Sequence, residues 1–192
     1  MQLKAFLKKE EAEIRHDTVH RILKTDIIAR IKVAKGLSKE AYGLKDYQEA
    51  LDSGFVDRVR GELNDCYRLG VNLESWLNTY QPPLSAGGTA AISSDVQDGI
   101  FGHIHTFANE SSDAIVRMLA YEKDRALMRT KVTDEEVWKR YEAAMVENQL
   151  HDLRRTCLAL ATNLVTMSAV LVNNVSHLTS HKKSDRDSIS MF

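Results

Sequence analysis

The sequence predicts an all-α protein, an antiparallel four-helix bundle built from long helices. Apolar residues recur at spacings of three and four over long stretches, which is the period of helices that pack along one face. The two prolines are adjacent, Pro82 and Pro83, so helices can run long on either side of them. With 192 residues, the chain is long enough for one domain with a sizeable core.

The first half of the chain predicts two helices. The first is expected over residues 3–36, with Gly36 as its stop. Residues 37–53 read as a polar connector with at most one short helical turn. The second helix is expected over 54–80, because its apolar residues alternate steps of three and four as in a packed seam. That series is Val56, Val59, Leu63, Cys66, Gly70, Leu73 and Leu77.

A loop is expected over 81–103, and its last part carries the most unusual motif of the chain. Residues 81–94 are rich in Pro, Gly, Ala and Ser, which is typical of a loop. Within residues 95–103, two glycines bracket an aromatic residue behind an aspartate, and glycine adopts positive φ without a Cβ penalty. We therefore expect a rigid turn that serves as a contact surface. Its residues are Gln97, Asp98, Gly99, Ile100, Phe101, Gly102 and His103.

The second half predicts a third helix over 104–130 and a fourth over 134–179. Thr133 and Glu136 form a capping-box pattern at the start of the fourth helix, which would be about 70 Å long at 1.5 Å per residue. This helix carries two apolar stripes. The first is Val146, Leu150, Leu153, Cys157, Leu160, Leu164, Met167, Leu171 and Leu178; the second includes Leu158, Ala161, Val165, Val172 and Val175. The second stripe favours contact with another subunit, and the alternative is that both merge into one broad buried face.

Composition argues against several classes of partner. The formal net charge is -1, so nothing indicates binding to nucleic acid or to an anionic membrane. The N-terminus lacks the apolar stretch of a signal peptide, and no run approaches a transmembrane helix of about 18 apolar residues. We expect a soluble protein of the cytoplasm, the nucleus or both. Cys66 and Cys157 lie on apolar stripes and are expected as free buried thiols.

No catalytic or metal-binding constellation emerges, so we expect a non-enzyme without a cofactor. A di-metal bundle needs Glu-x-x-His on two helices, and residues 13–16 supply the motif once. Two histidine pairs have i,i+4 spacing, His16 with His20 and His177 with His181, but solvated surface side chains are the favoured interpretation. His103 and His105 point to different sides of a helix.

Taken in order, these features resemble the 11S (REG-type) proteasome activator family. In that family a helix carries a tryptophan followed six residues later by a proline, as Trp76 and Pro82 are here. An activation loop of the form Asp-Gly-Asn-x-Phe-Gly-Val then leads into the third helix, and residues 98–103 stand in its place. This loop is one residue shorter, and the asparagine that follows the family's first glycine is replaced by Ile100 or deleted. The family's tail closes on an apolar residue and an aromatic, as Met191 and Phe192 do.

The resemblance implies a homo-heptameric ring that docks on the α-subunit ring of the 20S proteasome. C-terminal tails, here residues 181–192, would enter pockets between α-subunits, and the activation loops would open the gate without ATP or ubiquitin. The docking residues would be Ile189, Ser190, Met191 and Phe192. The alternative is an oligomeric helical scaffold or adaptor with no role at the proteasome, and a metal-dependent bundle enzyme is a distant third.

Overall fold

The computed structural model describes residues 21–80 and 94–179, and these residues are helical apart from short connections. The π-helix η1 (Ile22–Asp26) leads into α2 (Ile27–Gly43), and α3 (Tyr47–Asp52) and α4 (Phe55–Tyr80) follow. α5 (Ser94–Lys131) and α6 (Glu135–Thr179) complete the chain. No strand occurs within the described ranges, so the all-α class is confirmed.

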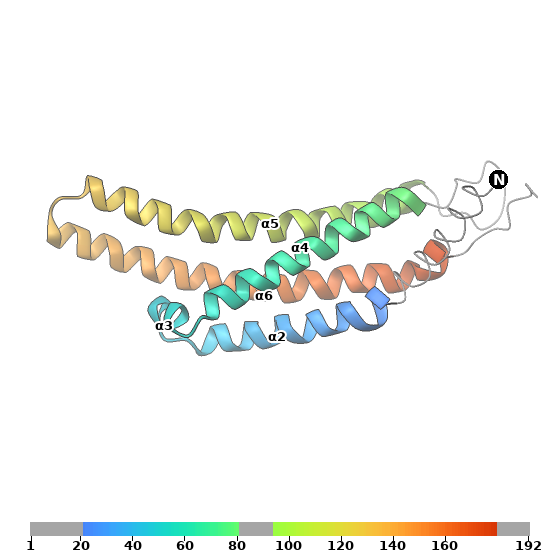
Figure 1. Ribbon diagram of the computed structural model, residues 1–192, viewed down its shortest axis with the longest axis horizontal. Helices are drawn as coiled ribbons and strands as arrows, with labels where there is room; N and C mark the ends of the chain where they lie inside the picture. The colour runs from blue at the N-terminus through green and yellow to red at the C-terminus, as the bar shows by residue number, and fades with distance from the viewer. Residues whose placement is uncertain (1–20, 81–93, 180–192) are drawn as a thin grey trace, which may run out of the picture.

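The long helices lie alongside one another (Figure 1). α4 packs most extensively against α5, and α2 packs against α6, with α5 also lying on α6. The seam between α2 and α4 is much looser. The end of α4, the start of α5, the start of α2 and the end of α6 gather at one end of the molecule, whereas the hairpin between α5 and α6 projects beyond α3 at the other.

The predicted end of the first helix at Gly36 is wrong, because α2 continues to Gly43. Ala34, Leu37, Ala41 and Leu44 are all buried and continue the steps of three and four past the glycine. Burial of this face outweighs the poor helix propensity of one glycine. The residues of the predicted helix before residue 21 lie outside the described residues.

The connector contains the one short helical segment that was expected, α3. Its N-terminus is capped by Asp46, whose side chain accepts a hydrogen bond from the backbone N–H of Glu49 at 2.8 Å. Gly54 has a φ of 66° and makes the turn into α4. From α6, Arg154 donates from Nε to the carbonyl of Ala41 at 3.1 Å and from Nη2 to that of Leu44 at 2.6 Å. These bonds satisfy carbonyls that the end of α2 leaves without helical partners.

The start of α6 lies within one residue of its predicted position, but the capping residue differs. Asp134, rather than Thr133, accepts from the backbone N–H groups of Glu136 at 2.9 Å and Val137 at 3.0 Å. A carboxylate at this position also complements the positive end of the helix dipole. Across the hairpin, Arg125 donates to Glu142, from Nε at 3.1 Å, and so ties α5 to α6.

The first apolar stripe of α6 is the buried face of that helix. Its described members from Leu150 to Leu171 are all buried, while Val146 is half-buried and packs against the core. The second stripe does not merge with it. Among its members whose burial is described, Leu158, Val165 and Val172 remain 48%, 42% and 57% exposed, and only Ala161 joins the buried face.

The expectation that no run approaches a transmembrane helix needs correction. Within the described ranges, α6 is long and apolar enough to cross a membrane by length and composition alone. Of the apolar 18-residue window that meets this criterion, 33% is buried inside the protein. The core helix of a soluble protein can meet the same criterion.

Candidate functional site

The structure places the predicted gate-opening residues in the first turns of α5, so the expectation of a turn at residues 97–103 is wrong. α5 begins at Ser94, ten residues before the predicted start at Ile104. Among the described glycines only Gly54 has positive φ, so Gly99 and Gly102 have ordinary helical backbone here. The role of residues 97–103 in gate opening stays a prediction.

α5 starts earlier than predicted because its buried face begins before the two glycines. The buried residues of α5 continue in steps of three and four without a break through the predicted turn. This series is Gln97, Ile100, Ile104, Phe107, Ser111, Ala114, Met118 and Tyr121, and Ala108 is buried beside it. Ile100 is only 3% exposed and belongs to the hydrophobic core. This spacing was the signal in the sequence that could have placed the start of α5 correctly.

α4 and α5 approach closely at Gly70, near the middle of α4. A Cβ added there would lie 2.8 Å from the Cβ of Ala108 and 3.3 Å from Cδ1 of Phe107. Two buried small residues therefore let the helix backbones come together. This contact fixes the position of α5 relative to α4 about one turn beyond residues 97–103, which we call the candidate segment.

A polar contact braces the same region and was not foreseen from the sequence. His105 Nδ1 lies 2.8 Å from Oε1 of Glu74 on α4, and Nδ2 of Asn109 lies 2.9 Å from His105 Nε2. Because an amide nitrogen only donates, Nε2 accepts and Nδ1 carries the proton given to Glu74. One turn earlier, the Phe101 ring lies parallel to the imidazole within 11°, with 6.0 Å between the ring centres. His105 thus connects the candidate segment to α4.

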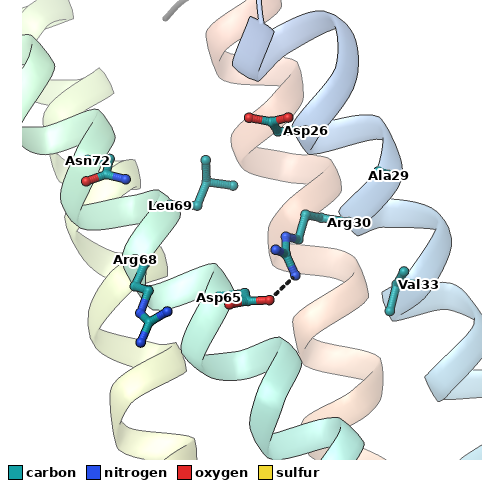
Figure 2. Close-up of a pocket in the computed structure, with 8 residues that line it drawn as sticks. All are labelled: Asp26, Ala29, Arg30, Val33, Asp65, Arg68, Leu69 and Asn72. Carbon is teal, nitrogen blue, oxygen red and sulfur yellow. Dashed lines mark ion pairs between the residues drawn. The ribbon is translucent and has the colours of Figure 1, made fainter.

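The loose seam between α2 and α4 holds an open pocket of about 350 Å³ (Figure 2). Its lining residues are Asp26, Ala29, Arg30, Val33, Asp65, Arg68, Leu69 and Asn72. Arg30 crosses the seam and lies 2.8 Å from both Asp65 and the buried Glu62. Burial raises the pKa of the Glu62 carboxyl, and the nearby guanidinium of Arg30 opposes that rise. In Figure 2, the Arg30–Asp65 ion pair occupies the middle of the pocket, and the Arg68 side chain points away from it.

Both cysteines are free and buried, as predicted. Burial raises the pKa of the Cys157 thiol to about 12 and also raises that of Cys66, so neither is a reactive thiolate at neutral pH. Among the described residues, no group of three or more His, Cys, Asp or Glu side chains could hold a metal ion. Residues 189–192, predicted as the docking tail, and the Glu13–His16 motif lie outside the described residues.

The exposed members of the second α6 stripe form a regular surface with their neighbours. Leu158, Thr162, Val165, Ala169 and Val172 are all exposed and follow steps of four and three. We call these five residues the outer seam of α6. A period of 3.5 residues is the spacing by which one helix packs along another, so this face is suited to a helical partner.

Comparison with known proteins identifies the fold. No family model matches the sequence, and no curated protein matches it. In contrast, the structure is similar to the crystal structure of the 11S subunit of the Plasmodium falciparum proteasome, PA28. The TM-score is 0.71, and the match covers 94% of this chain and 95% of that chain at 14% sequence identity.

The chain has the 11S-type fold. The similarity spans nearly the whole of both chains, so it is not confined to one helical hairpin. It bears out the fold that the sequence resemblance implied. At 14% identity the similarity concerns the arrangement of helices, and the roles of individual residues must be argued from this chain's own contacts.

Proposed function

We propose that this chain is an activator of the 20S proteasome that works without ATP or ubiquitin and catalyses no reaction itself. One observation carries the proposal: the 11S-type fold is matched over almost the full length of a proteasome-associated 11S subunit. The order of the sequence features, from Trp76 and Pro82 to Met191 and Phe192, supports it independently of the fold. The proposed place of action is the cytoplasm or the nucleus.

The assembly we propose is a homo-heptameric ring of antiparallel four-helix bundles. The outer seam of α6 supports an assembly, because an exposed, regularly spaced apolar face on so long a helix calls for a partner helix. A ring also makes weak tails effective. A single short segment makes a weak contact, because it loses conformational freedom on binding. Seven such segments on one body bind with a high effective concentration after the first.

The division of labour that we propose separates docking from gate opening. Residues 189–192 dock between α-subunits, and residues 97–103 at the start of α5 act on the gate. The arrangement of the helices supports this pairing, because the start of α5 and the end of α6, which leads toward residues 189–192, lie at the same end of the molecule (Figure 1). The extensive packing of α4 against α5 supports the helix that carries the gate-opening segment.

One observation favours the alternative, an oligomeric helical scaffold or adaptor. Residues 97–103 are helical, so the motif most specific to gate opening does not have the shape of a turn. A scaffold would use the outer seam of α6 and would have no effect on proteolysis.

The test measures association and stimulation separately. Deletion of Phe192 is expected to abolish binding to latent 20S proteasome from the same organism, measured by co-sedimentation, and to abolish stimulation of fluorogenic peptide hydrolysis with it. A matched control, Val137→Lys, changes an exposed residue at the far end of α6 and should alter neither. If the Phe192 deletion stimulates hydrolysis fully, the docking mechanism is wrong.

A further inference from the structure

The first turns of α5 contain two glycines that the helix does not need. A Cβ added at Gly99 or Gly102 would meet nothing within 4 Å, and both positions are exposed. Close packing therefore does not require glycine here, in contrast to Gly70. Glycine is the poorest helix former after proline, so this pair weakens the start of α5 and gains no packing in return.

The contacts of α5 define how far this weak segment extends. Among the residues of this segment whose burial is described, Gln97 and Ile100 are buried, and Ile100 belongs to the hydrophobic core. Their burial holds the segment in the helical state. Beyond Gly102 the helix is fixed more firmly, because Ile104 is fully buried and His105 is bonded to Glu74 at 2.8 Å. The boundary between the weak and the firm part of α5 therefore lies at residues 102–104.

We propose that residues 94–102 are a conformational switch, helical in the free protein and converted to a turn when the chain docks on the proteasome. The proposal rests on the proposed function and names the state in which the gate-opening segment acts. Two states explain the glycines: the helix tolerates them, and a turn with positive φ requires them. Contacts with the docked partner offset the free-energy cost of exposing Ile100. The His105–Glu74 bond keeps the helix from unwinding beyond residue 102.

Alanine at both glycines tests the switch, because it moves stability and activity in opposite directions. In the helix, each Gly→Ala change is favourable, so Gly99→Ala and Gly102→Ala should each raise the Tm by about 1–4 °C. If activity requires unwinding, the same preference disfavours the active state by about 2- to 5-fold per glycine, and roughly 5- to 30-fold for the double variant. Binding through residues 189–192 should be unchanged.

Two other glycines provide matched controls. Gly36 in α2 and Gly61 in α4 are also exposed within helices, and a Cβ at either meets nothing within 4 Å. Gly36→Ala and Gly61→Ala should raise the Tm to a similar extent and leave stimulation of peptide hydrolysis at the wild-type level. Loss of stimulation confined to the Gly99 and Gly102 variants then reports on the switch and not on stiffening of helices in general.

The outcomes separate this proposal from the proposed function. If the double variant binds, melts higher and stimulates hydrolysis as well as the wild type, the segment acts as a helix and the switch is overturned. If the wild-type chain itself gives no stimulation, the proposed function fails and the switch with it. Hydrogen exchange gives a direct readout: backbone amides of residues 97–102 should exchange faster in the docked wild-type chain than in the free chain. Equal or greater protection on docking contradicts the proposal.

Discussion

The close approach of α4 and α5 at Gly70 makes a quantitative prediction. In Gly70→Ala, the new Cβ would lie 2.8 Å from the Cβ of Ala108, a distance that real Cβ atoms essentially never show, and 3.2 Å from its Cα. Backbone and a short side chain cannot rotate away, so the two helices must separate. Overpacking of this kind costs about 1–3 kcal/mol. The gain from replacing a helical glycine, about 0.5–1 kcal/mol, offsets part of that cost.

Gly61→Ala in the same helix isolates the packing term. Gly61 is exposed and a Cβ there meets nothing within 4 Å, so this variant has the propensity gain alone. The free energies of unfolding of the two variants should differ by about 1–3 kcal/mol, with Gly70→Ala the less stable. For a domain of this size that is about 2–12 °C in Tm, measured by thermal unfolding followed by circular dichroism. Equal stability of the two variants would refute the close approach of α4 and α5.

Two further predictions concern the ion pair across the α2–α4 seam and the outer seam of α6. Arg30→Met leaves Glu62, which is 7% exposed, without its cation, and should cost about 1–3 kcal/mol near neutral pH. Since burial raises the pKa of Glu62 in the folded state, the folded protein binds a proton more readily than the unfolded one, and this loss of stability should shrink as the pH falls through that raised pKa. As a control, Arg140→Met removes the exposed ion pair of Arg140 with Glu136 and should show no such trend in urea unfolding. A loss of stability in Arg30→Met that does not depend on pH would contradict this prediction. Val165→Glu should dissociate the proposed oligomer to single chains of 21.7 kDa, as measured by light scattering. The control Val137→Glu should leave the oligomer assembled. If the Val165→Glu protein has the same mass as the wild type, the outer seam of α6 is not the interface.

The sequence was sufficient to predict the elements whose apolar spacing is uninterrupted. The bounds predicted for α4 and α6 agree with the structure within one residue, because their apolar seams are nearly continuous and the two helices start directly after Gly54 and Asp134. α2 and α5 are the helices for which a glycine was taken as a boundary, and each extends beyond that predicted boundary. At Gly36 and at residues 97–103, glycine was interpreted as the end of a helix although the buried residues on both sides stayed in phase. Tertiary burial decided both cases against local propensity.

The contacts that brace the candidate segment could not be predicted from the sequence. His105 and Glu74 are 31 residues apart, and Arg154 reaches carbonyls more than 100 residues away, so neither contact has a local spacing signal. The choice between one broad buried face and two separate faces on α6 also depends on where α2 and α5 lie. The structure shows that these helices cover the first stripe and leave Leu158, Val165 and Val172 exposed.

The most direct test of the central claim is hydrolysis of a small fluorogenic peptide by latent 20S proteasome from the same organism, with and without this chain. The preparation should first be sized, because a sevenfold ring of 21.7 kDa subunits has a mass of roughly 150 kDa. We predict that the assembled chain raises the rate of hydrolysis in the absence of ATP. An assembled ring that leaves the rate unchanged would contradict the account and favour a scaffold.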